Sequence, residues 1–321
     1  FKFESQFPNS FLDLEPGIPS SDTFRRVFSS LDPIEVGACF KSWVKQSYGE
    51  LIEGDTIAID GKALRGTREQ GARHWSHLVH AWANELGVCI AQHKVSNKSN
   101  EITAIPELLD SLAIKGCWIT MDAMGCQLAI LKQIRTQEAN YLVGLKGNQG
   151  HLLEQAEKVA KIQPSSDSAQ TIEKDHGRIE SRRCEVISDL KWLDLEPRWE
   201  EAGIQSLVKV EATRETAQKT SSETRLYLCS GILNAEEALA KTRGHWGIEN
   251  HLHWQLDVAF KEDQCKIRKG YADQNLALFR KMALHLLKNG PYSKGGVKAR
   301  MKRAGWDHEY LLDLILNLGY L

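Results

Sequence analysis

Two short apolar runs, each closed by an aspartate, constrain this chain more than any other feature. Residues 56–60 read TIAID and are followed by a glycine, and residues 117–122 read CWITMD. Small and β-branched residues in such runs predict buried strands, each ending at its aspartate. A carboxylate is rarely buried without a partner, so two of them on adjacent strands favour a divalent cation between them. Either aspartate alone could equally form a turn or cap a helix.

The composition is that of a folded protein with a sizeable core. Of 321 residues, 42% are hydrophobic and 26% are charged, and the formal net charge is −1. Any binding to nucleic acid must therefore rest on local basic groups. The seven cysteines are scattered singly with no CxxC pair, which favours free thiols in a reducing cytoplasm over a zinc ribbon or a disulfide framework. No apolar run predicts a membrane span, and no signal peptide is visible.

The order of the predicted elements indicates an α/β domain. Two helices within residues 20–46 form a helical lead-in, and the order that follows is three strands, helix, strand, helix, strand and helix. The strands are expected at 56–60, 77–83, 88–95, 117–122 and 140–145. This is the order of a ribonuclease H-like fold, in which the first and fourth strands lie side by side. That adjacency would bring Asp60 and Asp122 together.

Residues 163–233 have a different texture and predict a β-rich insertion. Short strands are expected at 184–187, 206–210 and 224–229, with an exposed loop at 163–168 and a polar hairpin tip at 216–223.

A helical tract that begins at Glu236 carries the third acidic candidate. Four residues spaced four apart form one face of this helix: His245, Glu249, His253 and Asp257. A neighbouring stripe is expected to be buried: Ile248, Leu252 and Leu256. Glu249 lies near the boundary between the two, where a carboxylate can point into a site. Helices at about 273–287 and 310–318 are expected to be packing elements.

A series of motifs in a fixed order resembles a known family. The motifs are IDGK at 59–62, TMDA at 120–123, LKGNQ at 145–149, HGRIE at 176–180 and HWGIEN at 245–250, preceded by GIPSSDTF at 17–24. The series resembles the insertion-sequence transposases of the H-repeat-associated type, a branch of the DDE transposases, over nearly the whole chain.

The resemblance implies a domain plan and a catalytic triad. It implies a helical lead-in at 1–50 and a ribonuclease H-like catalytic domain at 51–321, interrupted by the β-rich insertion at about 163–233 before the glutamate helix. The implied triad is Asp60, Asp122 and Glu249. Related transposases often carry a Tyr and an Arg before the glutamate and a Lys after it. Those offsets here hold Thr242, His245 and Leu256, so the DNA contacts would fall to neighbours such as Arg243 or to His245.

The resemblance also implies the chemistry. The protein would cut phosphodiester bonds at insertion-sequence ends and join the freed 3′-hydroxyl to target DNA, using two Mg²⁺ or Mn²⁺ ions about 4 Å apart. Asp60 would bridge both ions, Asp122 would hold one and Glu249 the other. The implied partner is double-stranded DNA, both element ends and target, bound by a homodimer in the synaptic complex. The implied location is the bacterial cytoplasm, in association with the nucleoid.

Local basic groups close in sequence to the three acids are the candidate DNA contacts. They are Lys62, Arg65, Arg68, Lys146, Asn148, Arg178, Arg182, Arg183, Arg243, His245, Lys266, Arg268 and Lys269. Charged clusters are usually solvated surface, but phosphate contacts through such groups would weaken steeply with salt.

Three other interpretations remain open. The histidines around Glu249 could belong to a zinc enzyme, although the HExxH spacing is absent. The chain could be a domesticated or inactive relic that binds DNA without cutting it, or a nuclease on the same fold.

Overall fold

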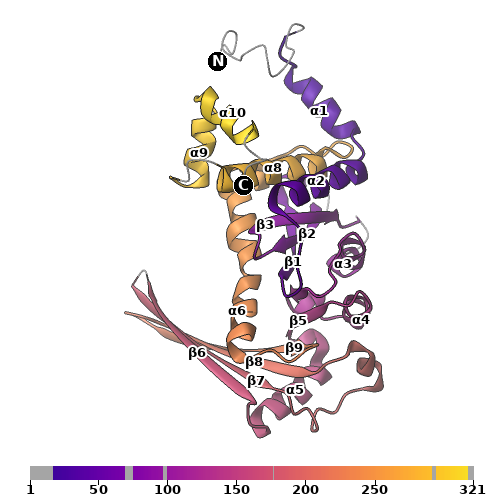
Figure 1. The fold of residues 1–321 in the computed structure, drawn as a ribbon, viewed down its shortest axis with the longest axis vertical. Helices are drawn as coiled ribbons and strands as arrows, with labels where there is room; N and C mark the ends of the chain where they lie inside the picture. Colours follow the sequence, from indigo (N-terminus) through magenta and orange to yellow (C-terminus); the bar gives the residue numbers. More distant parts are fainter. Residues whose placement is uncertain (1–16, 69–74, 97–99, 176, 291–293, 317–321) are drawn as a thin grey trace. The chain divides into compact units, whose positions relative to one another are not determined.

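The computed structural model describes residues 17–68, 75–96, 100–175, 177–290 and 294–316 (Figure 1). The chain forms two compact units. The helical unit comprises Phe1–Gly49, Ala63–Ser76 and His253–Leu321, and the sheet unit comprises Glu50–Lys62 and His77–Leu252. No helix in the described part of the chain is long and apolar enough to cross a membrane.

A single mixed sheet dominates the sheet unit, with the strand order β3-β2-β1-β4-β5-β9-β8-β7-β6 among the described residues. The strands are β1 Thr56–Leu64, β2 Ser76–Ala83, β3 Val88–Lys94, β4 Trp118–Met121, β5 Asn140–Leu145, β6 Asp167–Asp175, β7 Arg178–Ile187, β8 Ser206–Thr216 and β9 Thr220–Cys229. β4 runs parallel to both β1 and β5, whereas β9, β8, β7 and β6 pair antiparallel. The α/β class expected from the sequence is confirmed.

The central parallel strands are buried on both faces, which explains their uninterrupted apolar runs. Helices α3 Glu101–Asp110 and α4 Leu128–Thr136 lie on one side of these strands, and α6 Ala235–His245 lies on the other (Figure 1). Ile57, Ile119 and Val143 at the centre of β1, β4 and β5 have no exposed surface. The predicted adjacency of the first and fourth strands is confirmed, since β1 pairs with β4 from Thr56↔Trp118 to Ile59↔Met121.

One boundary expected from the sequence is wrong. β1 does not end at Asp60 but continues through Gly61 to Leu64. Only the parallel neighbour β4 stops at this level, whereas β2 lies along the other edge of β1. A glycine after an aspartate indicates a turn from local preference alone, and here the neighbouring strand overrides that preference.

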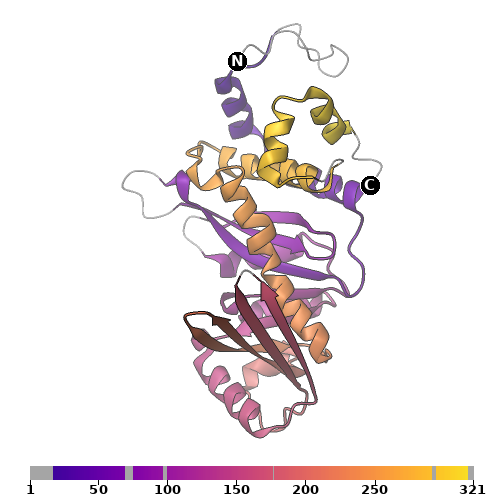
Figure 2. The same ribbon diagram turned by 90° about the vertical axis from the view of Figure 1, so that its left-hand side faces the viewer.

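The four strands that follow β5 extend the same sheet. β9 pairs with β5 from Leu142↔Cys229 to Leu145↔Leu226, and β8, β7 and β6 follow outward as a long ribbon (Figure 2). The base of this ribbon is buried against α6, where Val186 and Val208 pack in one cluster with Leu239. Helix α5 Gly150–Ile162 connects β5 to β6.

Two boundaries expected in this region are misplaced for the same physical reason. The loop is present at 163–166, but β6 already begins at Asp167. The polar hairpin tip is shorter than 216–223, because β8 reaches Thr216 and β9 starts at Thr220. The far half of the ribbon is largely exposed on both faces. Its residues are mostly polar, and hydrogen bonds between the paired strands hold them in place. The sequence therefore shows no hydrophobic alternation that would predict these strands.

The predicted glutamate helix is present but is not one continuous α-helix. α6 begins with a capping box, in which Asn234 accepts from the Glu237 N–H at 2.8 Å and Glu237 accepts from the Asn234 N–H at 3.2 Å. A π-helix, η5 Ile248–His253, follows and leads into α7 Trp254–Val258. The expected single helix face of His245, Glu249, His253 and Asp257 is therefore wrong, because a π-helical turn changes the rotation per residue. The expected buried stripe is confirmed, since Ile248, Leu252 and Leu256 have no exposed surface.

The helical unit packs the first two helices against a long helix near the C-terminus. α1 Ser21–Ser30 begins at the predicted cap, where the Ser20 hydroxyl accepts from the Thr23 N–H at 3.2 Å, and α2 Pro33–Tyr48 follows. Both helices pack on α8 Ala272–Asn289. The remaining helices are α9 Val297–Ala304 and α10 His308–Leu316.

Candidate active site

Strand register places the first two acids at the same level of the sheet. Ile59 of β1 and Met121 of β4 are the last paired residues, so Asp60 and Asp122 are the next residue on each strand. The carboxyl edge of parallel strands is where α/β sheets bind their ligands. The two carboxylates therefore lie at the edge that a sheet of this kind uses for chemistry.

Asp122 both caps a turn and faces the site. Its Oδ1 accepts the Met124 N–H at 2.9 Å and so starts the short 3₁₀ helix η2 Ala123–Gly125. The side chain is exposed. Asp122 can therefore cap the turn, as sequence preference allows, and still present its carboxylate to the site.

Asp60 lies in an environment that disfavours its charge. Burial raises the pKa of this carboxyl to about 7, and the negative charges of Glu101, Glu249 and Asp122 add to the increase against a hydrogen bond from the Gly61 N–H. Several carboxylates thus converge on a half-buried aspartate. A cation bound among them would relieve both the burial penalty and the repulsion.

Glu101 is a further acid that acts on the charge of Asp60 and was not expected from the sequence. It is the first residue of α3, and its carboxylate lies directly over Gly61: a Cβ built on Gly61 would stand 2.0 Å from Glu101 Oε1. His77 Nε2 pairs with the same oxygen at 2.7 Å, and the Glu101 side chain is only 15% exposed. The available signal was Gly61 itself, because a glycine inside a strand often marks a close approach.

Glu249 completes a cleft in the sheet unit. The cleft has a volume of about 290 Å³ and is lined by Asp60, Asp122 and Glu249 together with residues of β5, β9 and α6. Glu249 is the second residue of the π-helix η5. π-Helical turns inside α-helical tracts are common at functional sites because they change where side chains point. All three acids expected from the sequence therefore line one cavity.

His245 borders the same cleft as a neutral side chain. Its Nδ1 lies 3.2 Å from the Thr120 hydroxyl. Burial lowers the pKa of His245 to about 4, and the nearby Asp122 only partly opposes this shift. Near pH 7 the imidazole can therefore form hydrogen bonds but carries no charge for a phosphate.

The donor set fits a hard divalent cation. Carboxylate oxygens are the ligands that Mg²⁺ and Mn²⁺ prefer, and a bound cation would offset the burial and the repulsion that raise the pKa of Asp60. Within the described ranges, no three His, Cys, Asp or Glu side chains are already arranged to hold a metal ion, and this includes the three acids of the cleft.

A second, larger groove adjoins Glu249 on the side of the ribbon. It has a volume of about 650 Å³ and is lined by five arginines: Arg178, Arg182, Arg214, Arg225 and Arg243. Arg243 of α6 binds Glu173 of β6 through two contacts, at 2.6 and 2.9 Å, and Arg182 shares that glutamate at 3.1 Å. The groove is thus rich in cations that already have carboxylate partners.

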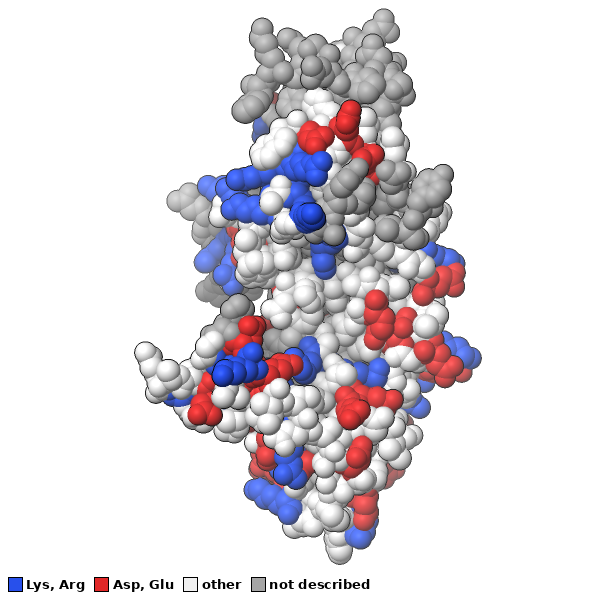
Figure 3. All heavy atoms as spheres, turned by 60° about the vertical axis from the view of Figure 1, so that its left-hand side comes forward, with Lys and Arg blue, Asp and Glu red and all other residues white. Residues whose placement is uncertain are grey.

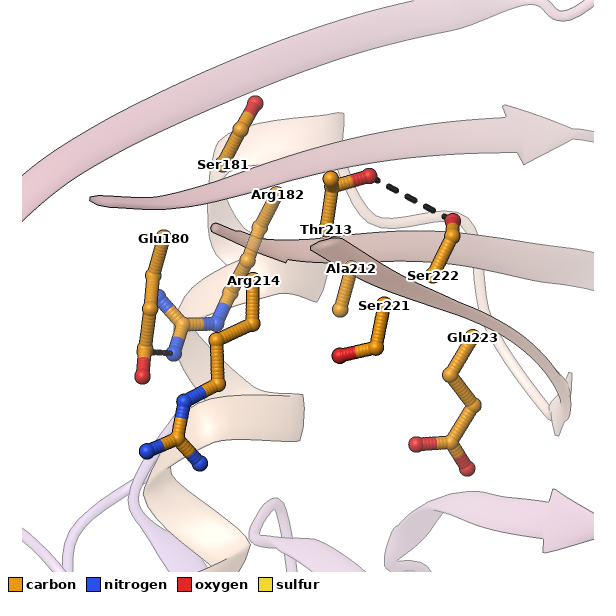
Figure 4. Close-up of a pocket in the computed structure, with 9 residues that line it drawn as sticks. All are labelled: Glu180, Ser181, Arg182, Ala212, Thr213, Arg214, Ser221, Ser222 and Glu223. Carbon is orange, nitrogen blue, oxygen red and sulfur yellow. Dashed lines mark hydrogen bonds and ion pairs between the residues drawn. The ribbon is translucent and has the colours of Figure 1, made fainter. Parts of the chain in front are cut away.

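The same ribbon carries a polar pocket, shown in Figure 4. It has a volume of about 460 Å³ and is lined by strands β7, β8 and β9. Arg182 contacts Glu180 there, and the Thr213 and Ser222 hydroxyls lie 3.3 Å apart. Arg214 extends from β8 without an ion-pair partner among the described residues (Figure 4). Arg214 and Arg225 are the two groove arginines that were not expected from the sequence.

Comparison with known proteins decides which kind of protein carries this site. The sequence profile described as "Transposase DDE domain" matches residues 52–286, well over half of the chain. The chain belongs to the DDE transposase family. A second profile, described as "DDE_Tnp_1-associated", matches residues 2–44 of this transposase. The family resemblance drawn from the motifs is therefore confirmed.

Three relatives cover nearly the whole transposase. "H repeat-associated putative transposase YhhI" of Escherichia coli K12 is 37% identical over 98% of this chain and 85% of its own length. "Putative transposase YncI" of Escherichia coli O157:H7 is 38% identical over 96% and 81%. "Putative protein YbfL" of Escherichia coli K12 is 38% identical over 98% and 85%. Among solved structures, a sugar N-methyltransferase, KedS8, aligns with a TM-score of 0.17 at 10% identity over 40% of this chain and 46% of its own, which carries no argument.

The basic residues predicted to contact DNA are divided between the two units of the transposase. Lys146 lines the cleft of the three acids, and the other members in the sheet unit are Lys62, Asn148, Arg178, Arg182, Arg183, Arg243 and His245. Lys62 is only 7% exposed. Asn148 donates its amide to the Ala123 carbonyl at 2.7 Å and so holds the turn after Asp122. The other five belong to the helical unit: Arg65, Arg68, Lys266, Arg268 and Lys269.

The surface charge of the transposase is mixed, as its net charge of −1 requires. On the face drawn in Figure 3, basic side chains gather in one region, and elsewhere basic and acidic side chains lie side by side. Contacts with DNA must therefore come from local groups and not from a uniformly positive surface.

Proposed function

We propose that this transposase cleaves DNA at the ends of an insertion sequence and joins the freed 3′-hydroxyl to target DNA, with Asp60, Asp122 and Glu249 as the catalytic carboxylates. The observation that carries the proposal is their convergence. Three acids from β1, from the end of β4 and from η5 line one cleft, and the family is defined by a DDE domain. We further propose that β1–β5 with α3–α5 form a ribonuclease H-like core.

The three carboxylates are the groups that would hold two Mg²⁺ or Mn²⁺ ions. When bound, such ions activate the attacking water or 3′-hydroxyl and stabilise the leaving oxygen. Asp60 must lose its proton to act as a ligand, and its raised pKa means that ligand binding and proton release are coupled. Glu101, paired with His77, lies against Gly61, the residue after Asp60, from outside the cleft.

Other residues of the cleft suit a phosphodiester. Lys146 and Arg225 are the cations among the lining residues. The Arg225 guanidinium donates two hydrogen bonds to the Glu223 carboxylate, each of 2.8 Å. The Arg225 guanidinium also stands 5.1 Å from the centre of the Trp246 ring. Both cations can contact backbone phosphates beside the scissile bond. The arginine groove next to Glu249 would continue this contact along the DNA.

Cleavage of a duplex that carries the element's own ends, with Mg²⁺ or Mn²⁺, tests the assignment. Glu249→Gln removes one ligand with little change in shape, and Asp60→Ala removes another. Each should reduce nicking by roughly 10³-fold or more, because residues that act as one catalytic unit have large individual effects. Glu236→Gln is the matched control, since Glu236 is an exposed glutamate on α6. A Glu249→Gln protein that still cleaves would remove Glu249 from the site.

The same assay separates the alternatives. A native chain that binds the ends and never cuts them would indicate a DNA-binding relic. A native chain that nicks DNA in a metal-dependent way but never forms joined products would indicate a nuclease. Joined products that need two ends in one complex would support a homodimeric synaptic complex.

A further inference from the structure

The helical unit contains a cationic groove that shares no residue with the catalytic cleft. Its volume is about 990 Å³, and its walls come from α1 and from the segment 266–269 that leads into α8. Its charged lining consists of five cations and one carboxylate: Arg25, Arg26, Lys266, Arg268, Lys269 and Asp22. Lys266, Arg268 and Lys269 are among the DNA contacts expected from the sequence, whereas Arg25 and Arg26 are not, because they lie more than 200 positions away in the chain.

Most of this positive charge is not neutralised within the groove. Asp22 pairs with Arg25 at 2.6 Å, and both side chains are well exposed, at 74% and 59%. Within the ranges that the structure describes, Arg26, Lys266 and Lys269 form no ion pair, and all three are exposed. The arginines of the sheet unit differ, since most of them have a glutamate partner. The groove therefore presents unpaired cations on two facing walls.

The two walls are held in place by specific contacts. The Asn275 side-chain amide of α8 donates to the carbonyls of Phe28 and Leu31 at the end of α1, at 2.9 Å each. Gly270 has φ +59°, and a Cβ there would stand 2.5 Å from the Ser29 carbonyl oxygen. Phe28 meets Phe279 edge to face at 5.1 Å. α1 is thus fixed against the start of α8, and the spacing of the cations does not depend on a flexible tail.

The chemistry of the lining favours a phosphate backbone over base edges. Guanidinium and ammonium groups on both walls match a chain of phosphates. The remaining lining residues are small or aliphatic, with no Asn, Gln or aromatic side chain among those described. Phosphate contacts fix position along a duplex but carry little sequence information. A groove of this composition suits double-stranded DNA held without base readout.

We propose that this groove is a second DNA-binding surface, which binds duplex DNA through its phosphates. DNA binding would then be the function of the region matched as "DDE_Tnp_1-associated". The proposal rests on the proposed function only in taking DNA as the partner. α1 lies within the matched region, residues 2–44. That region contributes Arg25 and Arg26 to one wall, and the segment 266–269 contributes the other.

Binding of the intact protein to a labelled duplex of random sequence tests the groove. The measurement is made in EDTA, so that no cleavage occurs, between 50 and 200 mM salt. The variant Arg26→Gln/Lys269→Gln removes one unpaired cation from each wall. It should weaken binding about 10-fold and reduce the slope of log K against log salt by about 2, close to 0.9 for each lost phosphate contact.

Two further variants show whether weaker binding comes from the groove itself or only from a change in total charge or in folding. Lys298→Gln/Lys302→Gln removes the same charge from exposed positions on α9 of the same unit and should change affinity less than twofold. Arg26→Lys/Lys269→Arg should bind like the native chain. Equal weakening by the groove variant and the α9 variant would overturn the proposal, because total charge would then explain the effect. An unchanged salt slope in the groove variant would also overturn it.

Failure of this proposal can be told apart from failure of the active-site assignment. The binding measurement needs no metal and no catalysis, so it gives a result even if Glu249→Gln retains cleavage. In cleavage assays the groove variant should raise the DNA concentration needed for half-maximal rate and leave the rate at saturating DNA unchanged. A lower saturating rate with unchanged affinity would contradict a role in DNA binding.

Discussion

At the scale of single residues, the site is organised by the cost of charge on Asp60. Burial and three neighbouring carboxylates raise its pKa to about 7, whereas His245 in the same cleft is kept neutral by burial, with a pKa of about 4. The cleft is also lined by Lys146 and by Arg225, which pairs with Glu223, so its carboxylates outnumber its cations. A bound cation is the natural complement of this arrangement.

The raised pKa of Asp60 predicts how stability depends on pH. The ordinary value of 3.8 becomes about 7 in the folded protein, so between these values the folded state binds more protons than the unfolded state. Stability from the protonated Asp60 is present below about pH 4 and is lost as the pH rises through about 7. Three pKa units correspond to at most about 4 kcal/mol.

Thermal unfolding in EDTA from pH 4 to pH 8 checks this. The stability of the native chain should fall relative to Asp60→Asn over that range, because only the native chain must ionise this group. Mg²⁺ should recover more stability in the native chain than in the variant. Parallel pH profiles of the two proteins would contradict the raised pKa.

The contact between Gly61 and Glu101 predicts a pair of compensating substitutions. A Cβ at Gly61 would stand 2.0 Å from the Glu101 carboxylate, so Gly61→Ala should destabilise the protein by about 1–3 kcal/mol, as overpacking does. It should also reduce cleavage, since Asp60 is the preceding residue. Gly61→Ala/Glu101→Ala should regain much of the stability. Urea unfolding measures both effects.

A second glycine of the sheet unit, Gly147, provides the control for this pair. A Cβ at Gly147 would meet nothing within 4 Å, so Gly147→Ala should leave stability nearly unchanged. Equal effects of alanine at both glycines would show that backbone entropy, and not the Glu101 contact, sets the result.

At the scale of elements, the ribbon β6–β9 and the helix α6 are joined by charge as well as by packing. Arg243 and Glu173 link α6 to the edge strand β6, and Arg243 lowers the pKa of Glu173 through their hydrogen bonds. Both side chains remain about 40% exposed, at 40% and 44%. An exposed pair of this kind contributes little to stability, so its main effect is to occupy cations that DNA could use.

This arrangement predicts that Glu173→Gln tightens DNA binding. The substitution should shift Tm by no more than about 3 °C, while it frees Arg243 and Arg182 for phosphates. Affinity for a random duplex should rise several-fold at low salt, and the rise should vanish at high salt. Filter binding and calorimetry measure the two quantities. Glu157→Gln, an exposed change on α5, is the control. Weaker binding by Glu173→Gln would show that the ion pair holds the groove in its binding form.

At the scale of the whole molecule, the three acids belong to one unit and the cationic groove to the other. A metal bound by the acids should therefore protect the sheet unit first, because a ligand stabilises the region that it contacts against local opening. None of Asp60, Asp122 and Glu249 lies in the helical unit.

Hydrogen exchange with and without Mn²⁺, in the absence of DNA, tests this division. Slower exchange is expected in peptides that contain Asp60, Asp122 and Glu249, and unchanged exchange in α1 and α8. Protection confined to α1 and α8 would contradict a metal site at the three acids.

Much of the sheet unit could be predicted from local pattern. The apolar runs at β1 and β4 identified buried strands, because both faces of these strands are covered. The stripe of Ile248, Leu252 and Leu256 is buried as expected. The outer half of the ribbon could not be predicted, because its polar residues are held by backbone pairing and carry no hydrophobic period.

By itself, the sequence determined which residues could perform the chemistry: two aspartates at the edge of core strands, one glutamate on a helix, and the motifs that identify the family. Only the tertiary structure decided how they are placed. The register of β1 and β4 sets Asp60 level with Asp122, the π-helix carries Glu249 into the same cleft, and α3 brings Glu101 over Gly61. Arg26 and Lys269 face one groove only after α1 packs on α8. Local pattern encodes burial and hydrogen bonding within a segment, whereas these contacts join residues far apart in the chain and exist only once the elements pack.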